Sequence, residues 1–403
     1  WQDLMFRAAK THNVNVSVRG NRDQTNYALS ANYLRNEGII PNTDFDRIVI
    51  RGNINRRISK KFYVSGNVQF THSEGNQKPT AGNTTDNMGV VLNSLRYNNV
   101  FPAFNPDGSY FNLKGETAED MSINHPLLFV NEVKNVTKNN AALGSLSVEF
   151  RPISDLSIKS TLNARYSNSV RDLYYPRSTQ QGTSTRGYAG NTWSEVLNYI
   201  SETYVNYTKK FRQHHSLGVM AGFSYEQTDL RSLNIRVFDF FSDDLQGANL
   251  SEGTLPQIPQ NDITKTKMAS FYGRVNYSYK DRYLLTATFR GDGSSKFGRN
   301  NKWAYFPSFA LAWRISEEPF MKKVNWITNF KLRAGYGLSG SQAISPYQSL
   351  CLLTTDGYYF GGNYVKGIGV GKYEWSASGG VYTGLGEPDL KWETTEQINV
   401  GVD

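Results

Sequence analysis

The side chains best suited to acid–base chemistry occur in this sequence as adjacent acidic pairs, Asp243–Asp244, Glu317–Glu318 and Glu119–Asp120. Two carboxylates hydrolyse a glycosidic bond only when they flank it from both sides. Adjacent carboxylates are usually solvated charge, and the sequence places none of these pairs across a sugar. The chain also lacks a GxSxG nucleophile motif, an HExxH zinc motif and a phosphate-binding Gly-Lys-Ser/Thr loop. The sequence therefore predicts no catalytic residues and no enzymatic turnover.

The five histidines do not form a ligand set for a metal ion. His214 and His215 are adjacent, and neighbouring residues of a strand point to opposite faces, so the two rings cannot easily chelate one ion. His12, His72 and His125 are far apart in the sequence and belong to different predicted elements. We therefore expect no histidine metal site.

One glycine-rich segment could suggest a cation-binding loop. Gly291–Gly298 contains Asp292, but it lacks the alternating carboxylates and the terminal Glu of a calcium loop. We interpret this segment as a tight external loop. Cys351 is the only cysteine, so neither an internal disulfide nor a cysteine-based metal site can form. The sequence predicts neither a metal nor a cofactor.

The composition narrows the class of protein. The chain has 403 residues, of which only 38% are hydrophobic, yet it contains 25 Tyr, 22 Phe and 35 Gly. A helical bundle is richer in aliphatic residues, and disordered chains lack aromatics. The net charge is +9, but the basic residues are spread along the chain, so we do not expect nucleic acid as a partner. No apolar run approaches the ~18 residues of a membrane helix.

Alternation of apolar and polar residues is the dominant pattern, and it predicts strands. Phe62, Val64, Gly66, Val68 and Phe70, for example, share one face of a run whose other face is polar. About thirteen such strands are predicted. They lie near residues 12–20, 25–35, 46–58, 62–72, 141–151, 155–168, 193–208, 214–228, 267–280, 282–291, 302–316, 328–338 and 395–403.

The connections between these strands alternate between short and long, with one intermediate connection, Glu317–Ile327, in the place of a short one. The short connections are Asn21–Gln24, Ser59–Lys61, Pro152–Asp155, Lys209–His215 and Lys280–Arg282. The long connections are Asn36–Phe45, Ser73–Asn140, Ser169–Thr192, Asp229–Thr266, Asp292–Asn301 and Ser339–Thr394. Tight turns at one end and large loops at the other are typical of outer-membrane barrels. The pattern predicts an all-β, antiparallel, up-and-down transmembrane β-barrel with long external loops.

Three features of the predicted barrel follow from individual segments. Trp303 and Trp313 share a face and are ten residues apart, which matches an apolar band roughly 25 Å high between aromatic girdles. The loop 73–140 contains apolar stretches, which we expect to fold back onto the protein. Glu317–Glu318 stands before Pro319, which suggests a short periplasmic helix through Val324.

Four segments carry a resemblance to a known family: the opening WQDLMFRAAKTHNVNVSVRG, Ser270–Met321, Phe330–Tyr347 and Leu390–Asp403. In this order they resemble the SusC/RagA family of TonB-dependent outer-membrane transporters of Bacteroidota. The opening WQDLMFRAAKTHNVNVSVRG resembles the passage from the plug to the first barrel strands. The most specific segment is Ser270–Met321, and Phe330–Tyr347 and Leu390–Asp403 also resemble family signatures. The resemblance implies a 22-stranded barrel, an N-terminal plug and a TonB box.

The chain starts at Trp1 without Met or a signal peptide and ends at Asp403 inside a strand-like run. We therefore expect a piece of a longer protein. Residues 1–403 would be a partial TonB-dependent receptor barrel domain that lacks the plug, the TonB box and the last strands. Because thirteen is an odd number, the strands near 12–20 and 395–403 should be open edges.

The function that the resemblance implies is import of oligosaccharides or oligopeptides across the outer membrane of a Gram-negative, Bacteroidota-like cell. The partners would be a SusD-like surface lipoprotein, the TonB complex acting through the absent N-terminal region, and outer-membrane lipid. The resemblance also allows a dimer of transporter–lipoprotein pairs. Two alternatives stay open: a passive porin or surface adhesin with the same barrel, and a soluble β-rich glycan-active enzyme.

Two groups of side chains are candidates for ligand contact. Aromatic faces stack on sugars and peptide side chains, and six aromatic residues crowd one long loop, where packing against a protein partner is an equal alternative. These candidates are Tyr358, Tyr359, Phe360, Tyr364, Tyr373 and Trp375. The polar faces of the strands would line the lumen, with Arg51, Asn53, Lys159, Arg165, Arg274, Lys331 and Arg333.

Overall fold

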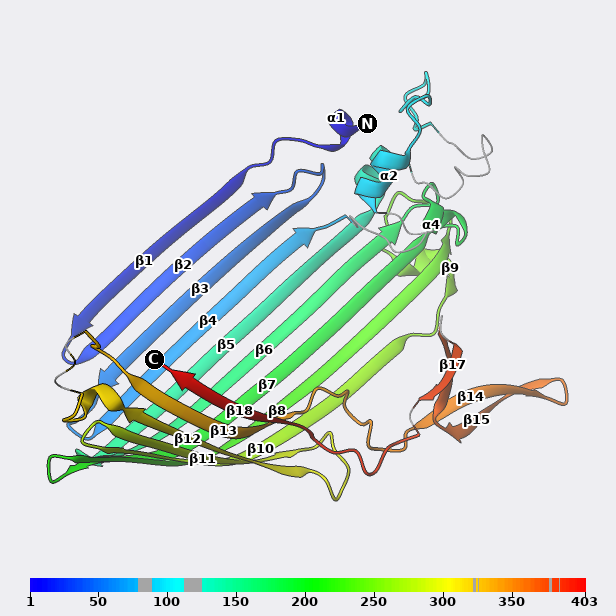
Figure 1. Ribbon diagram of the computed structural model, residues 1–403. Coiled ribbons are helices and arrows are strands. Elements are labelled where there is room, and N and C mark those ends of the chain that lie inside the picture. The colour runs from blue at the N-terminus through cyan, green and yellow to red at the C-terminus, as the bar shows by residue number, and fades with distance from the viewer. Residues whose placement is uncertain (79–88, 112–124, 322–323, 325, 377–378, 384) are drawn as a thin grey trace.

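One large antiparallel sheet, curled along its length, makes up most of this computed structural model (Figure 1). The structure describes residues 1–78, 89–111, 125–321, 324, 326–376, 379–383 and 385–403. In the order in which they pair, the main strands are β1 (Thr11–Arg22), β2 (Thr25–Glu37), β3 (Asp44–Arg57), β4 (Phe62–Asn76), β5 (Lys134–Ile153), β6 (Leu156–Tyr175), β7 (Tyr188–Phe211), β8 (His215–Phe240), β10 (Gln260–Tyr279), β11 (Tyr283–Ser294), β12 (Trp303–Arg314), β13 (Lys331–Ser341) and β18 (Glu393–Val402).

Smaller elements occupy the connections. They are α1 (Gln2–Met5), α2 (Val90–Arg96), α3 (Pro126–Glu132), α4 (Gln180–Thr183), the 3-10 helices η3 (Leu250–Glu252) and η4 (Ile315–Glu317), the short strand β9 (Gly253–Pro256), and the hairpin strands β14 (Leu353–Phe360), β15 (Asn363–Val370), β16 (Lys372–Ser376) and β17 (Gly379–Thr383). Among the described helices, none is long and apolar enough to cross a bilayer.

The predicted strands are confirmed, and each pairs with its neighbours in sequence order. Their ends differ from the prediction on one side, because β8 continues to Phe240 and β10 begins already at Gln260. Backbone pairing between Asn234 and Gln260 continues although the apolar alternation has ended. Much of the predicted loops 169–192 and 229–266 is therefore strand.

Strand length shows how far the sheet extends beyond a membrane. β8 has 26 residues, or roughly 85 Å at ~3.3 Å per residue. At a tilt of about 40–45° it rises roughly 60 Å, whereas the apolar band of such barrels is about 25 Å high. The long strands therefore extend the sheet beyond the apolar band.

The two ends of the sheet differ in their connections. At one end, called here the turn end, three turns have two consecutive residues with positive φ: Asp23–Gln24, Arg212–Gln213 and Lys280–Asp281. Such turns match the right-handed twist of paired strands and set the register of a hairpin. The connections from β2 to β3, β4 to β5, β6 to β7, β8 to β10, β11 to β12 and β13 to β18 lie at the opposite end, the loop end (Figure 1). The β12–β13 connection, residues 315–330, is also long but lies at the turn end.

The edge strands of the sheet are β1 and β18, as predicted, and no pairing joins them among the described residues. β1 leads into the tight turn at Asp23–Gln24, so it runs from the loop end to the turn end. Trp1–Lys10 therefore lie at the loop end. A strand that follows directly on a periplasmic plug would run the other way, so the interpretation of the opening segment as a passage from plug to barrel is wrong.

The two faces of the sheet differ in chemistry. Exposed apolar side chains such as Val16, Ile50, Phe70 and Leu311 share the outer face. At opposite ends of β12, Trp303 stacks on Phe271 and Trp313 stacks on Tyr283. Aromatic rings therefore lie at both ends of this strand on the outer face, which is the arrangement that the predicted girdle requires. The predicted lumenal residues are all on the other, polar face: Arg51, Asn53, Lys159, Arg165, Arg274, Lys331 and Arg333.

The turn between β12 and β13 corrects another prediction. The 3-10 helix η4 ends at Glu317, and no α-helix follows among the described residues up to Val324. Glu318 does not cap a helix, because its carboxylate accepts hydrogen bonds from Tyr283 Oη at 2.7 Å and Trp313 Nε1 at 3.1 Å. These hydrogen bonds hold the pKa of Glu318 below its usual value. The carboxylate thus fixes two girdle rings at the turn end.

The buried clusters formed by the described residues involve the loop end, not the middle of the sheet. Cluster 1 contains Met5, Ile40, Val90, Leu127, Phe129, Val130, Val133 and Tyr175. Cluster 2 contains Tyr174, Ala189, Val237 and Phe240. Cluster 3 contains Phe297, Phe306 and Trp392. The predicted fold-back of the 73–140 loop is confirmed, since α2 and α3 belong to cluster 1.

Candidate ligand-binding surface: the lumenal wall and the loop end

Cluster 3 fixes the base of one long external connection, residues 342–392. The ring of Phe297, from the β11–β12 connection, lies 4.8 Å from that of Trp392 between centroids. Phe306 on the polar face of β12 meets Trp392 edge to face at 5.7 Å. Trp392 Nε1 also donates a hydrogen bond to the carbonyl oxygen of Lys302 at 3.0 Å. The ring thereby joins the end of the long connection to β12 and to the neighbouring loop.

Polar contacts hold the other side of the same base. Gln342 Oε1 accepts from Ser294 Oγ at 2.7 Å, and Lys296 Nζ donates to the Gln342 carbonyl at 3.3 Å. A Cβ on Gly298 would collide with the carbonyl oxygen of Pro388, so this position requires glycine. Both ends of the 342–392 connection are therefore anchored on the β11–β12 region.

The six predicted contact residues lie beyond this base. Tyr358, Tyr359 and Phe360 are on β14 and Tyr364 is on β15, while Tyr373 and Trp375 are on β16. Backbone pairing puts Tyr359 opposite Tyr364. The Phe360 side chain is 80% exposed, and the other five side chains lie outside the described residues. The structure thus places the candidates on two hairpins but does not assign their contacts.

The lumenal wall contains a network that crosses four strands. Tyr272 on β10 donates a hydrogen bond from Oη to Glu202 on β7 at 2.6 Å. Its ring crosses Gly222 on β8, where a Cβ would collide with it. Arg290 on β11 lies over the same ring, 5.8 Å from its centroid, and pairs with Asp292 at 2.8 Å. Charges of both signs therefore face the lumen within a few ångströms.

This network corrects the interpretation of Gly291–Gly298 as a loop, because its first four residues belong to β11. Asp292 points into the polar face, where its side chain is only 9% exposed and both carboxylate oxygens accept from Arg290 Nε. No cluster that could hold a metal ion occurs among the described residues. The alternation of apolar and polar residues indicates the lumenal face but not its cross-strand partners, so sequence reasoning missed Glu202, Tyr272 and Arg290.

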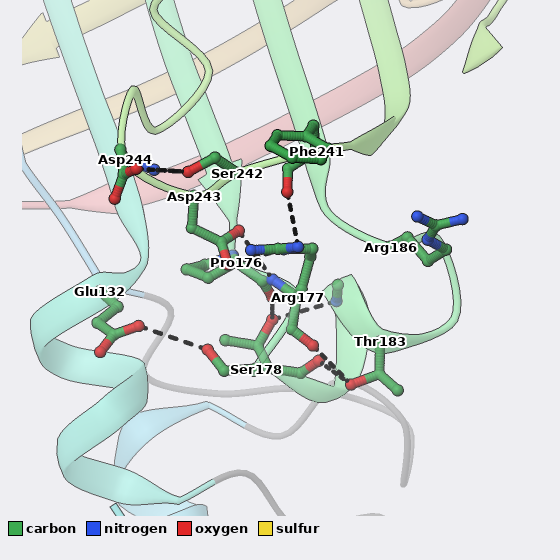
Figure 2. A network of polar contacts seen from close by, with 12 residues as sticks. Glu132, Pro176, Arg177, Ser178, Thr183, Arg186, Phe241, Ser242, Asp243 and Asp244 are labelled. Atoms are coloured by element: carbon green, nitrogen blue, oxygen red, sulfur yellow. Dashed lines mark hydrogen bonds and ion pairs between the residues drawn. The ribbon is translucent and has the colours of Figure 1, made fainter. Parts of the chain in front are cut away.

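A second network ties three external segments together (Figure 2). Asp243, in the β8–β9 connection, accepts from Arg177 Nε at 3.0 Å, Arg177 N at 3.1 Å and Tyr174 Oη at 2.6 Å. Arg177 Nη1 donates to the carbonyl oxygen of Phe241 at 2.8 Å. Ser178 Oγ donates to Glu132 of α3 at 3.4 Å, and burial raises the pKa of this carboxyl group. Asp243 therefore acts as a structural anchor.

The remaining acidic pairs do not assemble a catalytic site. Asp244 accepts from Ser242 Oγ at 2.6 Å and takes no part in the Asp243 contacts. Glu318 is used in the girdle at the turn end. Glu119–Asp120 lies outside the described residues. What the described surface can do chemically is to form hydrogen bonds, ion pairs and aromatic contacts with a ligand.

His125 links the parts of cluster 1. Its ring Nδ1 accepts from Leu128 N at 3.2 Å and caps α3, while Nε2 lies 2.8 Å from the Ala103 carbonyl oxygen. Because Nδ1 accepts a hydrogen bond, the proton of the neutral ring is on Nε2. The rings of Trp1 and Tyr97 pack against the imidazole. Burial is the main cause that lowers the pKa of His125.

We expect cluster 1 to lose stability in mild acid. A lowered pKa in the folded state means that the unfolded chain binds the proton more readily, so stability is complete above about pH 6.5 and falls as the pH drops toward the folded pKa. Protonation of Nδ1 also removes the acceptor for Leu128 N. Hydrogen exchange of the α3 amides should therefore be faster at pH 5.5 than at pH 7.5, after correction for intrinsic rates. The His125→Asn variant keeps a capping oxygen and should show no such change; equal pH dependence in both proteins would contradict the assignment.

Comparisons with known proteins agree with this geometry. Residues 93–403 match the family model described as TonB dependent receptor-like, beta-barrel. The chain is 30% identical over 406 residues to TonB-dependent receptor P3 of Formosa agariphila, covering 100% of this chain and 39% of that protein. It is 27% identical over 426 residues to TonB-dependent receptor SusC of Bacteroides thetaiotaomicron, with 100% and 40% covered. The chain thus spans about two fifths of the length of these relatives.

A solved structure shares the fold. The solved structure of the RagAB peptide transporter superposes on this chain with a TM-score of 0.81 at 22% identity, covering all of this chain and 43% of that one. At this identity the likeness establishes the architecture of the wall and not its ligand.

Proposed function

The chain belongs to the family of TonB-dependent receptor-like β-barrels, and on this premise we propose that it forms part of the wall of a SusC-type importer of oligosaccharides or oligopeptides. Such proteins lie in the outer membrane. The observation that carries the proposal is the asymmetry of the sheet: an apolar outer face, a polar inner face, tight turns at one end and anchored loops at the other.

The inner face and the loop end offer two chemistries that fit ligands of this kind. Glu202 and Arg290 present both charge signs, which suits peptides with charged termini and side chains. The sequences of the two hairpins in the 342–392 connection contain aromatic residues, a residue type that suits sugar rings and apolar side chains. The same hairpins could instead contact a protein partner.

The partners that we propose follow from the family. A SusD-like surface lipoprotein would cover the loop end, TonB would act through an N-terminal region outside residues 1–403, and two transporter–lipoprotein pairs could associate. Lipid would contact the outer face, and no nucleic acid is expected. We propose that the protein is not an enzyme. The exposed apolar face argues against the soluble glycan-active alternative.

The proposal is tested by replacing Tyr358, Tyr359 and Trp375 with Ala in the full-length protein. One aromatic contact contributes about 0.5–1.5 kcal/mol, so three should lower ligand uptake at least about tenfold. Uptake of labelled oligosaccharides and oligopeptides by cells measures the effect and separates the two ligand classes. Barrel assembly is checked by heat-modifiable migration in SDS gels.

Phe104→Ala is the matched control, because Phe104 is an exposed aromatic of another external loop. Unchanged uptake in the triple variant would show that these hairpins do not contact the ligand. Uptake that persists without TonB would favour the porin alternative, and a failure to assemble would show that the rings are structural packing.

A further inference from the structure

Three glycines on the outer face have no structural explanation within the sheet. Gly52, Gly66 and Gly144 lie in β3, β4 and β5 with regular antiparallel pairing and no positive φ. A Cβ at these positions would meet no atom closer than 3.4 Å, and at Gly144 none within 4 Å. Glycine weakens a strand interior and often marks a place where another molecule approaches closely. Here nothing of the described chain approaches.

Other glycines on the same face are covered by aromatic rings. A Cβ on Gly293 would collide with the Trp303 ring, and one on Gly20 would collide with the Tyr27 ring. Such rings shield the backbone of a glycine in a strand. The three glycines of β3–β5 have no such cover, so their outer side is left open.

The uncovered glycines form the floor of a groove of about 560 Å³. Its rim consists of outward apolar side chains from the neighbouring strands: Tyr27, Leu29, Ile54, Val68, Leu146 and Leu162. A second hollow of about 260 Å³ begins two residues farther toward the loop end, beside Ile50, Phe70 and Ala142, and it ends at His72 and Asn140. The two hollows follow the same strands.

The position of the groove in the bilayer follows from β4. Phe62, at the turn end, stacks on Phe150 with centroids 4.6 Å apart. His72, ten residues later, pairs with Asn140 at 2.7 Å and is the first polar outward position on this strand. Ten residues span about 33 Å along the strand and roughly 25 Å in height, which is the apolar band. Gly66 therefore lies near the bilayer centre, and the hollows cover the leaflet next to the loop end.

We propose that this groove is a binding site for one acyl chain of an outer-leaflet lipid, whose head group lies beside His72 and Asn140. The occupant must be apolar where it lies along the glycine floor and polar at its loop end. Its apolar part must be about as long as one leaflet is deep. The floor lies one side-chain length below the rim. A flexible chain can enter such a narrow hollow, whereas the broad pleated wall of a second barrel would rest on the rim and leave the floor empty.

The charged groups above the site are consistent with a head group held by hydrogen bonds. Lys138 and Glu74 form an ion pair at 3.4 Å directly beyond His72 and Asn140. Their charges cancel, so this edge attracts no ion of one sign strongly. The His72–Asn140 pair offers both donors and acceptors to a phosphate or sugar hydroxyl group.

The experiment fills the floor in the full-length protein with Gly144→Leu, a change that the open space around Gly144 should tolerate. Gly273→Leu is the control, because Gly273 is also outward and open but lies on β10 outside the groove. Native mass spectrometry after mild detergent extraction counts the lipids that stay bound. We expect the lipid-bound fraction to fall at least about tenfold in Gly144→Leu and to stay unchanged in Gly273→Leu.

Equal lipid retention in the parent protein, Gly144→Leu and Gly273→Leu would overturn the proposal. So would loss of a dimer in Gly144→Leu with unchanged lipid, because the occupant would then be a second copy of the protein. If Gly144→Leu fails to assemble, Gly66→Val fills the same floor and carries the same expectation. A fall in both filled and control variants would mean that lipid retention is a general property of the outer face, which also contradicts a specific site.

Discussion

Replacing Trp392 with Ala should release the base of the 342–392 connection from the wall. The variant loses the contacts with Phe297 and Phe306 and the hydrogen bond to the Lys302 carbonyl. Truncation of a buried aromatic residue costs about 3–5 kcal/mol, and here the loss falls on one loop base. We expect rapid protease cleavage within residues 342–392 on intact cells, together with a large loss of uptake.

Trp326→Ala provides the control, because Trp326 is 83% exposed at the turn end. That variant should keep the protease pattern and the uptake of the parent. Heat-modifiable migration should show an assembled barrel in both variants. If Trp392→Ala resists protease as well as the parent does, cluster 3 does not hold the loop.

Replacing Asp243 with Ala should separate the β6–β7 and β8–β9 connections. Three hydrogen bonds are lost, and the hydroxyl group of Tyr174, a fully buried residue, loses its partner. An unsatisfied buried polar group costs about 1–3 kcal/mol. Hydrogen exchange should rise at least about tenfold in residues 176–187 and 241–252 and stay unchanged in the membrane part of the strands.

The neighbouring carboxylate makes a close control. Asp244 is bonded only to Ser242 among the described residues, so Asp244→Ala removes the same charge without touching Arg177 or Tyr174. Equal exchange in the two variants would show that the loss of charge, and not the loss of the anchor, determines loop order.

The strands could be predicted from sequence because a half-buried strand shows its two faces as alternation. The loop-end parts of the strands could not be predicted in this way. Beyond the bilayer both faces of β8 and β10 contact water, so the alternation disappears although backbone pairing continues. The helix predicted after Ser316 failed for a related reason. Glu318 has the sequence position of a helix start, but Tyr283 and Trp313 use its carboxylate.

The site was less predictable than the fold because its contacts join distant segments. Nothing near Phe297 in the sequence points to Trp392, and nothing near Tyr272 points to Glu202. A partial pattern does exist: once the register is known, an aromatic residue beside a glycine on the next strand, such as Tyr272 beside Gly222, predicts a ring that lies across the backbone. The roles of the aromatic hairpins stay a prediction.

The tight turns at Asp23–Gln24, Arg212–Gln213 and Lys280–Asp281 have a consequence for how such proteins diversify. Each hairpin is aligned at the turn end, by residues that lie at the opposite end of the strands from the external loops. Insertions, deletions or whole exchanged segments at the other end therefore leave the alignment of the strands intact. The strands of the wall can therefore keep their pairing while the external loops change their binding specificity. Such changes can arise by gene duplication in nature or by loop transplantation in the laboratory.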